Sequence, residues 1–165
     1  QKAPIVMRQL ETVMGEQPFR DGLREYLKRH AFGNATWTDL VAVLDARTPE
    51  NLARWSRAWV EERGRPEIST AIDEDDGRIS RLTLRMRDPL RRRRVWPQRI
   101  TVTLGYAGGN RDVPVALSAT TTSVRAARGL PLPLYVLPNG GGLGYGLFLL
   151  DERSRDYLQI GRAHV

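Results

Sequence analysis

The hydrophobic pattern of this chain changes its period at Arg65-Pro66, and that change constrains the fold more than any other feature. Before this point apolar residues recur at spacings of three and four, which is typical of helices with one buried face. After it apolar and polar residues alternate, which is typical of antiparallel strands with one buried face. The sequence therefore predicts an α+β protein, with helices over residues 1–64 and an antiparallel β-sandwich over residues 65–150.

The helical region should contain about four helices joined by short turns. Gly15 and Gly33-Asn34 interrupt the pattern, Thr36 and Asp39 form a capping-box pair, and Thr48-Pro49-Glu50 predicts the start of the fourth helix. Gly22 lies inside the second helix, so we expect close packing to require it there. The expected apolar faces are Met7, Leu10 and Met14; Phe19, Leu23, Tyr26, Leu27 and His30; Leu40, Val41 and Leu44; and Leu52, Trp55, Trp59 and Val60.

The strand-rich region should contain about six or seven short strands separated by turns. Asp75-Asp76-Gly77 and Gly108-Gly109-Asn110 are hairpin signals. The alternating or apolar runs are Ile68–Ile72, Leu82–Met86, Ile100–Leu104, Val113–Leu117, Leu134–Leu137 and Tyr145–Leu150. Residues 151–158 begin another helix, and we interpret residues 159–165 as a tail that is foreign to the natural protein.

Composition excludes several classes of protein. The chain has 165 residues, no cysteine and no apolar run near the roughly 20 residues of a membrane span. Disulfides and thiolate metal sites are therefore ruled out. The net charge is +7, and all basic residues except Lys2 and Lys28 are arginine. Because such a bias can reflect the base composition of a gene, it does not by itself indicate nucleic acid binding.

No metal site is expected in this chain. The only histidines are His30 and His164, and the zinc pattern His-Glu-x-x-His is absent. His30 ends a helix, where a partly charged imidazole suits the helix dipole, so a structural role is favoured. The acidic run Asp73–Gly77 lacks the ligand spacing of a calcium loop and is better interpreted as a hairpin turn.

Two other segments invite a binding interpretation. Gly140–Gly144 is glycine-rich but leads into a strand, so no helix N-terminus is available for a phosphate and a tight turn is favoured. Arg91–Arg94, followed by Trp96, could hold a polyanion. The run is shorter than the five or six like charges usually taken as meaningful, so we expect a mobile, solvated loop with little role in stability.

Covalent catalysis finds no support in the residues. No Gly-x-Ser-x-Gly occurs, and no histidine is placed near a serine and an acid. Trp55 and Trp59 could form an aromatic platform, but their spacing on an apolar face favours the core, with Trp59 buried against Trp55.

Four segments in series resemble the alanyl/leucyl aminopeptidases, the aminopeptidase N-like family of zinc-dependent gluzincins. Gln1, Lys2 and Ala3 match the last three positions of a Tyr-x-Lys-Gly/Ala pattern that follows the family's catalytic tyrosine. Residues 19–44 resemble the next family block, and residues 55–66 resemble the segment that closes the catalytic domain. Asn139, Gly144 and Tyr145 resemble the Asn…Gly-Tyr motif near the end of the family's β-sandwich.

The resemblance implies a piece of a zinc metallo-aminopeptidase that removes N-terminal residues from peptides. Residues 1–64 would be the last helices of a thermolysin-like catalytic domain, 65–150 the β-sandwich, and 151–158 the start of a truncated helical domain. The zinc ligands, the general-base glutamate and the exopeptidase motif would precede this chain, and the tyrosine would immediately precede Gln1. No catalytic, cofactor-binding or metal role therefore passes to any residue here, and the piece alone should be inactive and bind no zinc.

An alternative remains open: a non-enzymatic β-sandwich module that contacts a partner through Arg91–Arg94. On the family interpretation the substrate of the full-length enzyme is a peptide, with no nucleic acid partner and no membrane span. Peptide specificity and oligomeric state are not given by the sequence. A bacterial cytoplasmic and a periplasmic location are both compatible with it.

Overall fold

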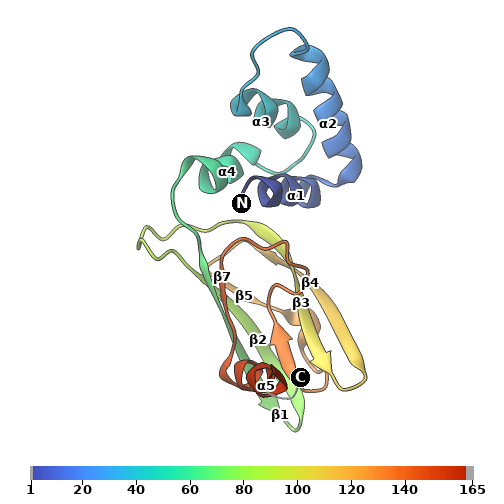
Figure 1. Ribbon diagram of the computed structural model, residues 1–165, viewed down its shortest axis with the longest axis vertical. Coiled ribbons are helices and arrows are strands. Elements are labelled where there is room, and N and C mark those ends of the chain that lie inside the picture. The colour runs from blue at the N-terminus through green and yellow to red at the C-terminus, as the bar shows by residue number, and fades with distance from the viewer. Residues whose placement is uncertain (1, 163–165) are drawn as a thin grey trace. The chain divides into compact units, whose positions relative to one another are not determined.

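The computed structural model describes residues 2–162 and divides into two compact units, one ending at Arg63 and the other beginning at Gly64. The first unit is helical and the second is built mainly of strands (Figure 1). The division falls beside Arg65-Pro66, where the hydrophobic period changes in the sequence. Among the described residues, no helix has the length and apolar character needed to cross a membrane.

The helical unit contains four α-helices and one π-helical turn. These are α1 (Ala3–Met14), α2 (Glu16–Arg29), α3 (Trp37–Asp45), α4 (Leu52–Ser56) and η1 (Arg57–Glu61). Gly15 separates α1 from α2 with a φ of 91°, a conformation that glycine adopts without steric cost. The core of this unit includes Leu10, Leu44, Leu52 and Trp59, which are fully buried.

The predicted capping box at the start of α3 is confirmed. The Thr36 hydroxyl accepts a hydrogen bond from the Asp39 amide at 3.2 Å, and the Asp39 carboxylate accepts one from the Thr36 amide at 3.0 Å. Both satisfy amide groups that have no partner inside the helix. The apolar face predicted for this helix is confirmed too, since Leu40, Val41 and Leu44 are buried.

The start predicted for the fourth helix is wrong. Thr48-Pro49-Glu50 lies outside the helix, and the N-cap is Asn51, whose side-chain oxygen accepts a hydrogen bond from the Arg54 amide at 2.8 Å. The Asp45 carboxylate accepts the Leu52 amide at 2.7 Å and satisfies a second free donor of the first turn. Two polar side chains therefore place the helix start three residues after the proline signal.

The end of this helix also differs from the prediction. Residues 57–61 form a π-helix, in which each hydrogen bond spans one more residue than in an α-helix. The wider turn shifts the buried face: Ala58 and Trp59 are buried, whereas Val60, predicted on the buried face, is 42% exposed. The stacking of Trp59 on Trp55 is confirmed, with ring centroids 5.1 Å apart.

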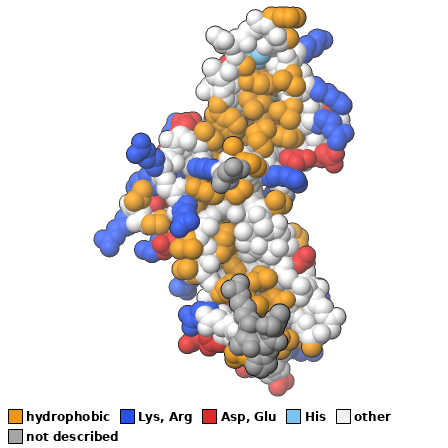
Figure 2. All heavy atoms as spheres, viewed as in Figure 1, with side chains coloured by type: hydrophobic (Ala, Val, Ile, Leu, Met, Phe, Trp, Pro, Cys, Tyr) orange, Lys and Arg blue, Asp and Glu red, His pale blue; other side chains and the backbone are white. Residues whose placement is uncertain are grey.

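Helix α2 shows why a glycine sits in a helix interior. A Cβ atom built on Gly22 would lie 2.5 Å from Leu44 Cδ2. Because Leu44 is fully buried, it has little room to move, so the expectation that packing requires Gly22 is confirmed. The buried face predicted for α2 is too wide, since Leu27 is 66% exposed. Figure 2 shows hydrophobic side chains over much of one face of this unit.

The second unit is a sandwich of two sheets. Its strands are β1 (Glu67–Asp75), β2 (Arg78–Arg87), β3 (Gln98–Tyr106), β4 (Gly109–Leu117), β5 (Thr121–Ser123), β6 (Tyr135–Leu137) and β7 (Leu147–Leu149). The strand order is β5-β2-β1-β7 in one sheet and β4-β3-β6 in the other. A 3₁₀ turn, η2 (Arg125–Ala127), follows β5, and helix α5 (Glu152–Arg162) follows β7.

The predicted alternation of buried and exposed residues is confirmed in β4. It also holds in β2 and β3 except at Thr83 and Thr103, which are buried although the pattern places them on the exposed face. The inward apolar side chains of these strands are Leu82, Leu84 and Met86; Ile100, Val102 and Leu104; and Val113, Val115 and Leu117. The hairpin at Asp76-Gly77 is confirmed, with φ of 49° and 70° at these two residues, as a primed turn requires.

The sheets depart from the predicted purely antiparallel pattern at one pair. Strand β7 pairs with β1 in parallel, with Glu67 opposite Leu147 and Ser69 opposite Leu149. The alternation of side chains cannot distinguish the two orientations over three residues, because both have a period of two. Strand β5 is also three residues long and carries no apolar residue, so the hydrophobic pattern missed it.

Helix α5 packs on strand β6. The Ser154 hydroxyl accepts a hydrogen bond from the Val136 amide at 2.8 Å, and the Tyr135 and Tyr157 rings stack with centroids 5.6 Å apart. The helix continues through residues 159–162, and the remainder of the proposed foreign tail, including His164, lies outside the described residues.

Replacing Trp59 tests the helical core. Trp59→Ala removes a fully buried ring from its stack on Trp55 and should lower the free energy of unfolding by about 3–5 kcal/mol. Phe32→Ala is the matched control, because Phe32 is fully exposed and its loss should cost less than about 0.5 kcal/mol. Chemical denaturation followed by circular dichroism measures both, and equal midpoints for the two variants would contradict the assigned core.

Candidate functional site

The glycine-rich loop before β7 is held by two amide side chains. The Asn139 side-chain oxygen accepts a hydrogen bond from the Gly144 amide at 2.8 Å, and its NH2 group donates to the Gly144 carbonyl at 3.4 Å. Gln98, which is 2% exposed, does the same for Tyr145, accepting from its amide at 2.8 Å and donating to its carbonyl at 3.0 Å. Each side-chain amide thus makes the pair of backbone hydrogen bonds that a neighbouring strand would otherwise make with the loop.

The same loop is closed from a third direction. The Tyr145 hydroxyl donates to the Gly64 carbonyl at 3.1 Å. A Cβ atom on Gly144 would lie 2.5 Å from Phe148 Cζ and 2.8 Å from the Asn139 oxygen, so only glycine fits there. The loop therefore acts as a tight turn, and the interpretation of Gly140–Gly144 as a turn is confirmed. The pattern Asn…Gly-Tyr indicated two of the partners, but Gln98 carried no sequence signal.

The arginine run is more ordered than the sequence prediction of a solvated loop. Asp88 has a fully buried side chain, and Arg92 donates to it twice, from Nε to Oδ2 at 3.0 Å and from Nη2 to Oδ1 at 3.3 Å. The Arg94 guanidinium lies 5.2 Å from the Trp96 ring centroid. These contacts differ from the solvated loop that the sequence predicts, and the small contribution of the run to stability stays a prediction.

Arg91 and Arg93 differ from Arg92 and Arg94 in their backbone conformation. Both are exposed, and both have positive φ, of 56° and 54°. Arg92 is exposed as well, with 35% of its side chain accessible, but it is held by Asp88.

Burial and hydrogen bonding act in opposite directions on Asp88. Burial acts to raise the pKa of its carboxyl group. The hydrogen bonds from Arg92 and from the Leu90 amide, together with the Arg92 charge, outweigh burial and hold the pKa below its ordinary value of 3.8. The carboxylate is therefore ionised in the folded protein, and it neutralises an arginine in an arginine-rich segment.

The remaining candidates are dispersed. His30 is the C-cap residue of α2, and its ring lies 5.0 Å from that of Tyr26. Lys2 is the N-cap residue of α1, and Gln1 lies outside the described residues. Within residues 2–162, no three His, Cys, Asp or Glu side chains come together as metal ligands. The described residues therefore do not fit a zinc ion, and no arrangement of nucleophile, base and acid joins the separate candidates.

Comparison with known proteins shows similarity to aminopeptidases. Residues 1–59 match the model of the peptidase family M1 domain. Over 173 aligned positions the chain is 35% identical to an aminopeptidase N of Streptomyces lividans, covering 93% of this chain and 19% of that protein. It is 33% identical over 78 positions to aminopeptidase M1 of Arabidopsis thaliana, covering 47% of this chain and 9% of that protein.

A solved structure shares the fold. Legionella pneumophila aminopeptidase A, crystallised with aspartic acid, superposes with a TM-score of 0.55 at 17% identity, over 74% of this chain and 14% of that one. The sequence matches, rather than this likeness in fold, confirm the resemblance of the chain to the M1 aminopeptidases. The chain spans about a fifth or less of the length of these relatives.

The Arg92–Asp88 ion pair can be tested by removing its cation. Arg92→Gln leaves the buried Asp88 carboxylate without its charged partner and should lower the free energy of unfolding by about 1–3 kcal/mol. Arg93→Gln makes the same charge change in an exposed side chain and should cost less than about 0.5 kcal/mol. Urea denaturation of both variants measures the difference. Equal stability would restore the solvated-loop prediction.

The depressed pKa of Asp88 also predicts a pH dependence. Because the folded state holds the carboxylate in its charged form, the stabilisation is present above the unfolded pKa and is lost as pH falls through the lower folded pKa. The stability difference between the natural chain and Asp88→Asn should therefore be largest near neutral pH and shrink below about pH 4. Denaturation at a series of pH values checks this, and a constant difference would contradict it.

Proposed function

We propose that this chain is part of a zinc metallo-aminopeptidase that removes N-terminal residues from peptides. The observation that carries the proposal is the match of residues 1–59 to the M1 peptidase domain. The names of the relatives support it, since they are aminopeptidases from a bacterium and a plant. The hydrolytic activity, the peptide substrate and the zinc belong to the longer protein.

The chemistry of such an enzyme requires groups that these residues do not supply. Bound zinc polarises a peptide carbonyl and lowers the pKa of a water molecule to about 7. Of the two histidines only His30 lies in the described part, where it ends a helix, and no group of three potential metal ligands forms among the described residues. We therefore place the zinc ligands, the general base and the oxyanion-stabilising tyrosine before Gln1, and we propose that the 165-residue chain alone is inactive.

Each region of the chain has a supporting role in this proposal. Residues 1–64 form the last helices of the catalytic domain, residues 65–150 the β-sandwich, and residues 151–158 the start of a helical domain. The stacked tryptophans and the capping box stabilise the helical region. The side-chain hydrogen bonds of Gln98 and Asn139 to the loop before β7 stabilise the sandwich. None of these groups takes part in the reaction.

The competing function is a non-enzymatic module that binds a partner through Arg91–Arg94. The structure disfavours this use of the run, because Arg92 is engaged by Asp88 and Arg94 by Trp96. The run contains four charges, which is fewer than the five or six expected of a meaningful basic block.

Activity and metal content test the proposal together. The 165-residue chain should show no hydrolysis of alanyl or leucyl amides, with or without added zinc, and no stoichiometric zinc after dialysis. A longer product that extends upstream through the zinc motif and the tyrosine should hydrolyse them, and a chelator should abolish the activity. Circular dichroism of both products controls for folding.

The possible failures are distinguishable. Zinc-dependent hydrolysis by the 165-residue chain alone would overturn the placement of the catalytic groups before Gln1. A longer product that is folded, contains zinc and hydrolyses no aminoacyl amide would overturn the aminopeptidase proposal itself.

A further inference from the structure

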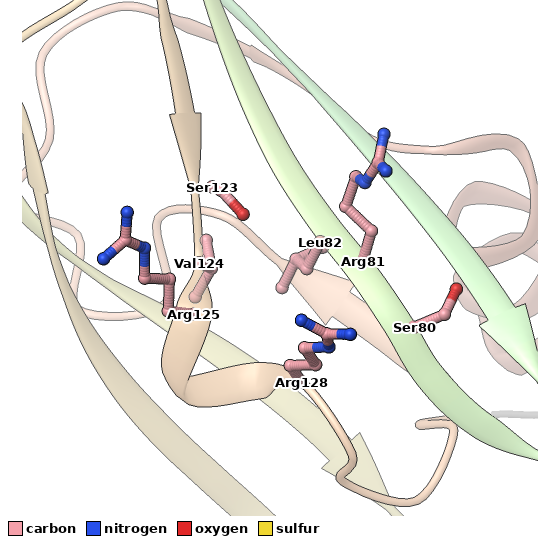
Figure 3. Close-up of a pocket in the computed structure, with 7 residues that line it drawn as sticks. All are labelled: Ser80, Arg81, Leu82, Ser123, Val124, Arg125 and Arg128. Atoms are coloured by element: carbon pink, nitrogen blue, oxygen red, sulfur yellow. The ribbon is translucent and has the colours of Figure 1, made fainter.

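The sandwich unit contains a cavity of about 330 Å³ beside strand β2. Its lining residues, drawn in Figure 3, come from β2 and from the segment that follows β5: Ser80, Arg81, Leu82, Ser123, Val124, Arg125 and Arg128. This volume is within the range of about 300–1,000 Å³ that small-molecule sites occupy in proteins.

Backbone hydrogen bonds frame the cavity. The Val124 amide donates to the Leu82 carbonyl at 2.8 Å, and the Gly129 amide donates to the Ile79 carbonyl at 2.8 Å. Between these two contacts, the segment that follows β5 moves away from β2 and forms the 3₁₀ turn η2. The cavity therefore lies between a strand and a turn that is fastened to it at both ends, and its shape is set by the backbone.

A β-bulge in β2 lies at the same place. In the ladder with β1, Asp73 lies opposite Arg81 and Glu74 lies opposite Ile79, so Ser80 is the extra residue of the strand. A bulge redirects a side chain that regular alternation would place elsewhere, and bulges are common beside binding sites. Ser80 thus adds a hydroxyl to the cavity, and Ser123 adds a second from the other side.

The lining is cationic and contains no acid. Arg81, Arg125 and Arg128 line the cavity, and within residues 2–162 none of the three has an ion-pair partner, although Asp73 lies opposite Arg81 in the ladder. Elsewhere on the sandwich arginines do pair with acids, as Arg87 does with Glu67 and Arg92 with Asp88. These guanidiniums therefore keep their donor groups available for a ligand.

The arrangement separates an apolar part from a charged part. Leu82 and Val124 are 1% and 3% exposed and form an apolar surface of the cavity. Figure 3 shows the Ser123 hydroxyl and the Arg128 guanidinium on the side of the turn that faces β2, with Arg81 and Arg125 extending away on opposite sides. The two outer arginines are exposed.

We propose that this cavity binds a small molecule in which a dianionic phosphoryl group is attached to an apolar body. Guanidinium groups bind phosphate oxygens in pairs through their planar donors, and hydroxyl groups supply further donors. Three cations match a phosphate monoester, with a charge of about −1.5 to −2 at pH 7, better than a carboxylate with one charge. The site is independent of the aminopeptidase proposal, because it uses only residues of the sandwich unit.

Phenyl phosphate is a suitable probe, with benzoate as the monoanion of similar size. Titration of the ¹⁵N-labelled 165-residue chain with phenyl phosphate should give saturable shifts at the amides of Ser80, Ser123 and Arg128. Benzoate should bind at least about ten-fold more weakly, because it offers one charge and two oxygens. Equal affinity for both probes, or shifts that do not saturate, would overturn the phosphoryl assignment.

Variants separate a built site from general attraction to a basic surface. Arg128→Gln should weaken phenyl phosphate binding at least about ten-fold, the effect expected for losing hydrogen bonds to a charged group. Arg85→Gln makes the same charge change on β2 outside the cavity and should leave affinity within about two-fold. Unchanged spectra away from the cavity show that both variants fold, and equal losses in both would mean diffuse attraction and overturn the proposal.

Discussion

The sandwich depends on the hydrogen bonds that the side-chain amides of Gln98 and Asn139 make with the loop before β7. The strand that it positions, β7, is three residues long and pairs in parallel with β1, so its own ladder is weak. These hydrogen bonds fix Gly144 and Tyr145 immediately before that strand. The Leu147 amide then donates a hydrogen bond to the Pro66 carbonyl at 2.8 Å. The first and last strands of this unit thus come together through side chains rather than through a long ladder.

Much of the fold could be predicted because the signals involved are local. The capping box at Thr36 and Asp39, the Asp76-Gly77 turn and the alternation in β2, β3 and β4 each follow from residues within one element. Features set by single polar side chains or by a change of helix type were missed. Asp45 and Asn51 reset the start of α4, and the π-turn at 57–61 turned Val60 outward. Nothing in the periodicity of the sequence indicates either effect.

The candidate sites divide in the same way. The turn interpretation of Gly140–Gly144 needed only the residues of the loop, whereas the order of the arginine run depends on a buried acid at Asp88. The cavity beside β2 was invisible in the sequence, because Ser80, Arg81 and Leu82 lie more than 40 positions before Ser123 and Arg128 and only the fastened turn brings them together. Charge alone misled at Arg91–Arg94 and gave no signal at the cavity.

Ser154 of helix α5 has a consequence for how the sandwich meets other chains. Strand β6 is at the edge of its sheet, and its Val136 amide donates to the Ser154 hydroxyl instead of to another strand. An unpaired edge is a template on which a strand from a second molecule can add. By occupying that donor and laying the Tyr157 ring over Tyr135, α5 blocks this addition. Helix α5 therefore protects the edge of this sheet from self-association.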